Sequence, residues 1–197
     1  MKRKVVALTL LGTAVAASTV WAVQQDIDVS ARMRIGLSFA NKIDMDFTPA
    51  TGHIDFYGTP DPLVDFVKLG TDGAITVDGT VFQPSALTGT PGSVDINSDG
   101  VSSVFISCTA TATLAEPGAN TMTVDQLQGT MNTGTAFTAP GYVCSGLASV
   151  TPLSYTLTGT DKIIMGGRLV GPADVVTALY STATAGGTPA TVRVIYQ

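Results

Sequence analysis

The chain has 197 residues, a formal net charge of −5 and a charged fraction of only 13%, about half the usual share. An acidic chain with few cations offers no basic patch to a phosphate backbone, which excludes nucleic acid as an expected partner. The apolar content is too high for a disordered chain. The length suits one domain with a sizeable core.

Residues 1–22 predict a cleaved secretory signal peptide. Lys2 to Lys4 form a positive region, an apolar stretch runs from Val5 to about Ala17, and Val20 and Ala22 fit a small-residue cleavage site. The apolar stretch is too short to cross a bilayer of roughly 30 Å as a permanent helix. An N-terminal membrane anchor is the alternative. We expect export to the periplasm, the cell surface or the medium, with no transmembrane segment in the mature protein.

The mature chain, residues 23–197, is predicted to be one domain with a disulfide. The leader holds three of the ten basic residues and none of the fifteen acidic ones, so the mature formal charge is −8. Cys108 and Cys144 are the two cysteines, and in an oxidising compartment such a pair most simply forms one disulfide. A catalytic or metal-binding thiol is the alternative, which a single histidine makes unattractive.

The stretch Ile27–Phe39 alternates without exception between apolar or small residues and polar or glycine residues. This period of two predicts a half-buried strand. Because the stretch directly follows the expected leader, we interpret residues 23–39 as an N-terminal strand that can exchange between copies. Its expected inward face is Ile27, Val29, Ala31, Met33, Ile35, Leu37 and Phe39.

Further strands follow along the chain. We expect mostly loop over His53–Leu69, where prolines oppose a central strand. A tight hairpin is predicted from Ala74–Val77 to Thr80–Gln83 across the turn dipeptide Asp78-Gly79. A long strand is predicted over Ser102–Leu114, with Val104, Ile106, Cys108, Ala110, Ala112 and Leu114 on one face.

The remaining predicted strands complete an all-β architecture. A turn is expected at residues 117–120, and Gln128–Pro140 is expected to be a loop. Strands are predicted over Thr121–Leu127, Tyr155–Thr158, Lys162–Val170, Val175–Thr184 and Thr191–Tyr196. Many short strands separated by Gly- and Pro-containing turns favour an antiparallel β-sandwich, Ig-like or pilin-like.

Several of these segments together resemble a known family. The strand ending Asn41–Phe47, the segments Ala74–Asp78 and Thr121–Val124, the dipeptide Leu169-Val170 and the terminal strand Val192–Gln197 occur in an order similar to the DUF4402 family of bacterial secreted β-proteins. The resemblance covers roughly residues 27–197 and implies an exported β-sandwich without an established activity. The family usually has Gly after the Phe at the Phe47 position, and the cysteine pair is not its hallmark. A looser similarity, through the alternating N-terminal segment and penultimate Tyr196, is to fimbrial subunits.

Residues suited to catalysis are scarce. His53 is the only histidine, so a Ser–His or Cys–His pair has one candidate base, and we interpret it as an exposed loop residue. Asp44 and Asp46 lie on the same face of a predicted strand and could be considered as a catalytic carboxylate pair. We interpret them as two solvent-exposed side chains. The only Trp lies in the leader, so sugar stacking would fall to Tyr57, Tyr142 or Tyr155. We expect no enzyme.

One segment has the spacing of a cation site. Asp95, Asn97 and Asp99 followed by Gly100 match the first half of an Asp-x-Asn-x-Asp-Gly calcium loop. The twelfth position, a Glu in a full EF-hand loop, is Ile106, which excludes an EF-hand. A calcium-stabilised loop and an Asx turn are the two interpretations left.

The sequence therefore predicts a structural or adhesive extracellular protein, a fibre or pilus subunit that assembles with copies of itself or related subunits by strand exchange. An extended segment can add to the edge of a partner's sheet through main-chain hydrogen bonds, with alternate side chains filling pockets. The alternative is a secreted glycan- or matrix-binding module stabilised by calcium.

Overall fold

The computed structural model describes residues 36–48, 52–132, 135–136, 144, 146–147, 152–172 and 175–197. The chain divides into two units, Met1–Arg34 and Ile35–Gln197, and every described residue belongs to the second. The expected signal peptide and most of the alternating segment therefore lie outside the described residues. Within the described part no helix is long and apolar enough to span a membrane.

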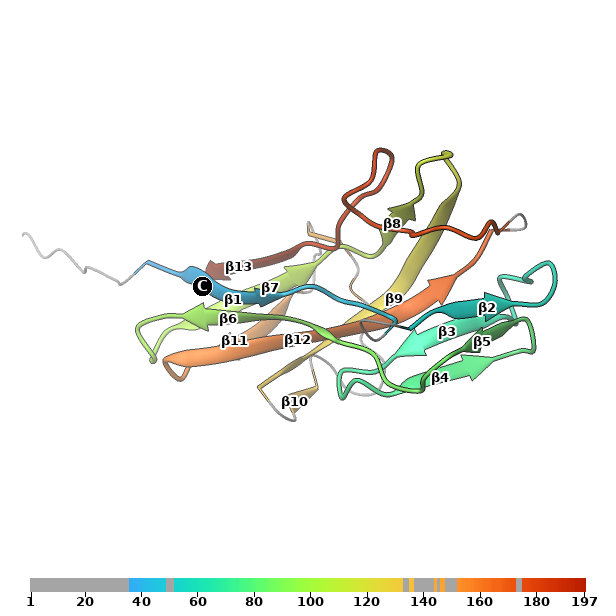
Figure 1. Ribbon diagram of the computed structural model, residues 1–197. Helices are drawn as coiled ribbons and strands as arrows, with labels where there is room; N and C mark the ends of the chain where they lie inside the picture. Colours follow the sequence, from blue (N-terminus) through green and yellow to red (C-terminus); the bar gives the residue numbers. More distant parts are fainter. Residues whose placement is uncertain are drawn as a thin grey trace, which may run out of the picture. The chain divides into compact units, whose positions relative to one another are not determined.

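The described residues form an all-β fold of antiparallel strands, which confirms the predicted fold class (Figure 1). The strands are β1 Ser38–Ile43, β2 Ile54–Phe56, β3 Phe66–Leu69, β4 Ile75–Asp78, β5 Phe82–Pro84, β6 Gly92–Asn97, β7 Ser103–Cys108, β8 Ala112–Ala115, β9 Thr121–Met131, β10 Thr135–Ala136, β11 Leu153–Thr156, β12 Thr160–Val170 and β13 Val192–Tyr196.

Strand β12 is the centre of the larger sheet. One edge of β12 pairs with β9, and the other pairs first with β6 and then with β3. The change of partner falls at Gly166, where a Cβ atom would lie 2.1 Å from the main-chain oxygen of Leu69. Only glycine allows this close approach of two backbones. Strand β1 extends the sheet beyond β6, β4 extends it beyond β3, and β8 and β10 pair with β9.

A second sheet of three strands, in the order β11-β7-β13, supplies the other layer. The side chains of Val104, Ile106 and Cys108 on β7 are fully buried, as the alternation in that segment predicts. They belong to the same hydrophobic core as Ile163 of β12 and Leu127 of β9. Two sheets that share one core in this way are the layers of a β-sandwich. A separate pair, β2-β5, completes the sheets.

The hairpin predicted across Asp78-Gly79 is wrong. Strand β4 pairs with β3, which precedes it in the sequence, and β5 pairs with β2. The tight turn lies instead at Asp72-Gly73, where the Asp72 carboxylate accepts a hydrogen bond from the Ala74 N–H and Gly73 has a φ of 84°. Asp72-Gly73 and Asp78-Gly79 flank the same strand, and local turn chemistry alone does not distinguish these two dipeptides. The same pairing makes β3 an internal strand, where mostly loop was expected.

Other strand boundaries also differ from the prediction. The segment Ser102–Leu114 is divided into β7 and β8, which belong to different sheets, and Ala110 between them is exposed. Strand β9 continues to Met131, into the expected loop Gln128–Pro140. The described residues of Val175–Thr184 contain no strand, only an isolated bridge between Ser181 and Ala115.

Candidate functional site

Strand β1 occupies an edge of the larger sheet, and two residues of the predicted inward face lie in it or directly before it. Leu37, just before the strand, is half-buried against the core. The side chain of Phe39 is 52% exposed, and that of Ile43 is 48% exposed. The prediction that Phe39 points into the core is therefore wrong. Ile27, Val29, Ala31, Met33 and Ile35 lie outside the described residues.

A bulge fixes β1 to its neighbour. The register with β6 shifts between Ala40 and Ile43, and Asn41 within the bulge has a φ of 49°. The side-chain amide of Asn41 donates a 2.8 Å hydrogen bond to the Asp95 carboxylate of β6. On the other side of β6, the Lys162 ammonium lies 3.5 Å from the same carboxylate. Three strands are thereby tied together, and a bulged edge is a poor template for further strand addition.

The register also shows where the sheet ends. Ser38, the first residue of β1, pairs with Asn97, the last residue of β6. The described ladder between β1 and β6 therefore includes Ser38 and Phe39, the last two residues of the alternating segment.

The three-stranded sheet has two edges that no described strand covers. Neither β13 nor β11 has a described partner other than β7. On β13 the core-facing residues Val192, Val194 and Tyr196 are only half-buried, whereas the core-facing residues of the central strand β7 are fully buried. By contrast, the outer edge of β8 is covered at two points, through bridges from Thr188 and Ser181.

The disulfide is formed as predicted and joins the two sheets. Cys108 and Cys144 are both fully buried, with their Cα atoms 5.1 Å apart. Cys108 ends β7 in the smaller sheet, while the Cys144 N–H donates to the Leu127 carbonyl of β9 in the larger one. The Gly146 N–H returns a hydrogen bond to the Cys108 carbonyl. The bond therefore cross-links the layers of the sandwich.

The three candidate calcium ligands lie at the end of β6 and in the turn that follows it. Asp95 and Asn97 lie within β6, and the Asp95 carboxylate accepts a hydrogen bond from the Asn41 amide and lies 3.5 Å from the Lys162 ammonium. The Asp99 carboxylate accepts hydrogen bonds from the Val101 and Ser102 N–H groups, which is the Asx-type turn that the sequence left as the second interpretation. Among the described residues no cluster of three or more His, Cys, Asp or Glu side chains could hold a metal.

We therefore predict that millimolar calcium leaves the melting temperature unchanged. Calcium at 100 times the Kd of a site would stabilise the fold by about 2.7 kcal/mol. This would raise the melting temperature of a domain of this size by several degrees. Differential scanning fluorimetry with calcium, and with magnesium as the matched ion, checks this. A rise of several degrees that calcium alone produces and a chelator reverses would restore the calcium-stabilised loop.

A buried carboxylate that the sequence analysis missed lies at the start of β12. Asp161 is fully buried and accepts hydrogen bonds from the Thr158 N–H at 2.8 Å and the Thr158 hydroxyl at 2.7 Å. The Asn132 amide and the Tyr155 hydroxyl each donate at 3.2 Å. Burial raises the pKa of Asp161, but these donors outweigh it and hold the pKa below 3.8. The group is a structural anion whose lone pairs are engaged.

Two further carboxylates hold loops in the same manner. Asp65 accepts from the N–H groups of Asp61 and Thr80, and those bonds lower its pKa despite burial. Glu116 accepts from the N–H of Asn120 and from that of Gly118, across the predicted turn at residues 117–120, and its pKa is lowered as well. In the sequence, each of these carboxylates is an isolated acidic residue near turn residues. This pattern is too common to identify a carboxylate that holds a loop.

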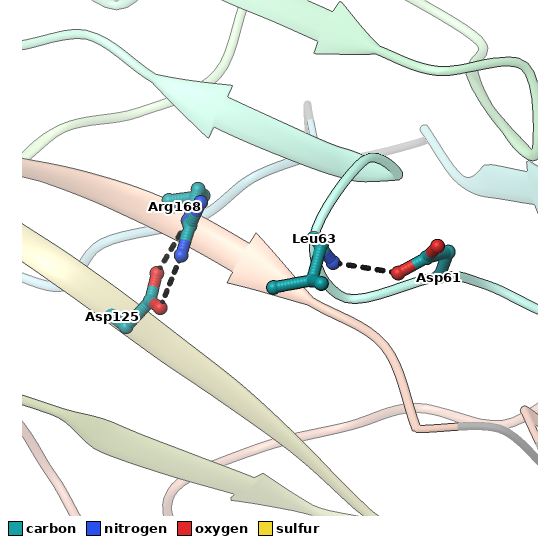
Figure 2. A network of polar contacts seen from close by, with 4 residues as sticks. All are labelled: Asp61, Leu63, Asp125 and Arg168. Carbon is teal, nitrogen blue, oxygen red and sulfur yellow. Dashed lines mark hydrogen bonds and ion pairs between the residues drawn. The ribbon is translucent and has the colours of Figure 1, made fainter.

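Arg168 and Asp125, directly paired across β12 and β9, form a two-pronged ion pair (Figure 2). The guanidinium also lies 4.6 Å from the Phe66 ring centroid, and Lys68 lies 4.8 Å from the same ring and pairs with Asp78. Figure 2 also shows the Leu63 N–H held by the Asp61 carboxylate in the adjacent loop. Asp125 neutralises Arg168, and Asp78 neutralises Lys68. We therefore interpret these ion pairs as contacts that stabilise the sheet and not as a binding site for an anion.

The residues considered for catalysis are dispersed. The His53 imidazole is exposed and lies 3.4 Å from the Asp55 carboxylate. Asp44 pairs with Lys42, while Asp46 accepts from the N–H and hydroxyl of Thr48, so the two carboxylates serve separate local contacts.

The tyrosines considered for sugar stacking also separate. Tyr57 is 68% exposed, and Tyr142 lies outside the described residues. Tyr155 is half-buried, and its hydroxyl is engaged by Asp161 and Asn132, so its ring is held in place by the fold.

The fold and its edges define a disulfide-linked, all-β sandwich domain. Residues 59–196 match the family described as a domain of unknown function, DUF4402. The match covers more than half of the chain, so this protein belongs to the DUF4402 family. No curated protein and no solved structure matches the chain.

Proposed function

We propose that this protein is an exported structural subunit of the cell surface or extracellular space, which assembles when its N-terminal segment adds as a strand to another copy. One observation carries the proposal: the ladder between β1 and β6 ends at Ser38 and Asn97. Within the described residues this ladder pairs only Ser38 and Phe39 of the alternating segment with β6. An extended segment with one apolar face gains most by adding to a sheet edge, where both its backbone and its apolar side chains find partners.

The disulfide supports export. A fully buried cross-link between two sheets suits an oxidising compartment, where such bonds form and persist. The lysine-led apolar leader at residues 1–22 supports the same location. The expected product is the chain from Val23 to Gln197.

The buried carboxylates support a structural role, because they take part in hydrogen bonds that hold loops. Asp161, Asp65 and Glu116 each accept two or more hydrogen bonds, so their charges stabilise loops. A subunit that bears mechanical or environmental stress benefits from such fixed loops and from an inter-sheet disulfide. Strand exchange needs main-chain groups and apolar side chains, with no reactive group.

The test is a matched pair of variants in the mature chain. Val29→Asp places a charge on the predicted inward face of the segment, while Ser30→Asp places the same charge on the outward face. Since burial of an unpaired carboxylate is costly, we expect Val29→Asp to remain monomeric and Ser30→Asp to assemble like the wild type. Size-exclusion chromatography with light scattering measures both masses over a range of concentrations.

Two results would count against the proposal. The first is a wild-type mature chain that stays monomeric at every concentration. The second is equal assembly of the two variants, because alternate faces of an inserted strand cannot tolerate the same charge equally. Circular dichroism of both variants ensures that the sandwich itself is folded.

A further inference from the structure

Two loops meet at one end of the larger sheet, and together we call them the tip. Residues 57–65 connect β2 to β3, and residues 175–180 follow β12. The start of β3 pairs with the end of β12, which brings the two loops to the same end of the sheet (Figure 1). They are adjacent, because a Cβ atom on Gly171 would lie 3.3 Å from both Pro60 and Val175.

The tip presents a group of exposed apolar side chains. Among the described residues, ten large apolar side chains are exposed, and five of them belong to the tip. Single exposed apolar residues are normal on a protein surface, whereas a group of them marks an interaction site. The most exposed are Leu63 at 85% and Leu179 at 82%, and the others are Tyr57, Val64 and Val176.

Hydrogen bonds hold both loops in shapes that keep these side chains outside. The Asp61 carboxylate accepts from the Leu63 N–H (Figure 2), and the Asp65 carboxylate accepts from the Asp61 N–H. In the second loop, Tyr180 packs against the core, and its hydroxyl accepts from the Val176 N–H and donates to the Val176 carbonyl. Side chains on loops fixed in this way lose little conformational entropy when a partner covers them.

The charge of the tip favours a basic and apolar partner. Residues 57–65 and 171–180 include three aspartates and no lysine or arginine. The cations near the adjoining ends of β3 and β12, Lys68 and Arg168, are paired with aspartates. Residues 29–35 have the opposite character, since they carry two arginines, no acid and alternating apolar side chains. Opposite charges around apolar anchors give an interface its specificity, and the same aspartates repel an anionic lipid surface.

The N-terminal segment joins the domain at the other end of the sheet. Ser38, the first residue of β1, pairs with Asn97, and Asn97 pairs with Thr160 at the start of β12. The tip lies beyond Val170, and the eleven residues of β12 span about 33 Å. Arg32 precedes Ser38 by six residues and reaches at most about 20 Å from it. The arginines of one chain therefore fall short of its own tip, which leaves a second copy as the partner.

We infer that the tip of one copy binds residues 29–35 of a second copy, with Leu63 and Leu179 against the apolar face of that segment and its two arginines beside the aspartates of the tip. This inference rests on the proposed assembly through the N-terminal segment and specifies the surface that the segment contacts. Because the two contact surfaces lie at opposite ends of each copy, the contact is head-to-tail and extends into a filament wherever the rotation does not close a ring.

Two leucine variants of the full mature chain test the tip. Leu63→Asp replaces an apolar anchor by a charge of the same sign as Asp61, whereas Leu87→Asp makes the same change at a 67% exposed leucine beside β4. Loss of one leucine contact weakens binding by about tenfold or more. We therefore expect Leu63→Asp to need about tenfold more protein for half-assembly, and Leu87→Asp to assemble as the wild type does. Light scattering over a concentration series measures both, and unchanged melting temperatures show that both are folded.

Opposite charges at one exposed position test the contribution of the arginines. Thr59 is exposed in the first loop of the tip. Thr59→Lys adds a cation that repels Arg32 and Arg34 of the second copy, so it should weaken assembly, whereas Thr59→Asp should assemble at least as well as the wild type. High salt should narrow the difference between the two variants. Equal assembly of both variants at low salt would overturn the charge match.

A mixing experiment separates a lost surface from a misfolded subunit. Leu63→Asp retains the N-terminal segment, and Val29→Asp retains the tip. At a concentration where each variant alone is monomeric, an equal mixture should form dimers that cannot extend. A mixture that stays monomeric, although the wild type assembles, would overturn the inference.

The remaining outcomes distinguish the tip from the proposed function. If the wild type stays monomeric at every concentration, the proposed function fails. If the wild type assembles, Val29→Asp does not and Leu63→Asp assembles like Leu87→Asp, strand exchange stands and the tip is wrong. Monomeric wild type that binds phosphatidylcholine vesicles, with binding lost in Leu63→Asp, would assign the tip to a lipid surface and overturn both.

Discussion

Replacing Cys108 and Cys144 together by alanine should lower the free energy of unfolding by about 4 kcal/mol. The two residues are 36 apart in sequence, and closing a loop of this length removes conformational entropy from the unfolded chain. The bond also connects β7 of one sheet to the residue hydrogen-bonded to β9 of the other, so its loss allows the layers to separate. Urea unfolding followed by circular dichroism gives the value.

The wild-type chain treated with a reductant is the matched control. Reduction leaves the sulfur atoms in the core, so agreement between the reduced wild type and the alanine variant assigns the loss to the covalent link. A difference below about 1 kcal/mol between oxidised and reduced protein would contradict the cross-linking role of the disulfide.

Asp161→Asn should cost about 3 kcal/mol. The two carboxylate oxygens accept four hydrogen bonds, two of them from Thr158. An amide in the same place turns one acceptor into a donor, which then opposes the Thr158 N–H or hydroxyl and leaves buried donors without partners. Asp44→Asn, at a side chain that is 83% exposed, is the matched control and should change the free energy of unfolding by less than about 0.5 kcal/mol.

The same residue predicts how stability depends on pH. Because the pKa of Asp161 in the folded protein lies below 3.8, the unfolded chain takes up the proton first as the solution is acidified. The stabilisation is therefore fully present above the unfolded pKa and is lost as the pH falls through the folded pKa. The melting temperatures of the wild type and Asp161→Asn should converge below about pH 4, and a gap that widens on acidification would contradict the assignment.

Side-chain alternation predicted the strands that form the core, because a period of two is imposed by burial of one face. Val104, Ile106 and Cys108 lie inward as expected, and the disulfide followed from the presence of two cysteines alone. The break between β7 and β8 was not predictable, since Thr109–Thr111 keeps the alternating pattern while the chain crosses between sheets. Thr- and Val-rich residues 175–184 have strand propensity, yet they make only one isolated bridge, between Ser181 and Ala115.

The candidate site was predictable only in part. The sequence predicts residues 23–39 as the segment that exchanges between copies, because alternate residues of Ile27–Phe39 are apolar or small. It could not identify which strands lie at the edges of the sheets, because this depends on the order of strands in a sheet, which local patterns do not encode. The anchoring of Asp161 by Asn132 and Tyr155 joins residues 29 and 6 positions away, so it becomes visible only in the fold.

Electron microscopy of the purified mature chain tests strand exchange between copies most directly. We expect filaments from the wild type and from Ser30→Asp, and single particles from Val29→Asp under the same conditions. Uniform single particles of the wild type at high protein concentration, with the disulfide intact, would contradict the account.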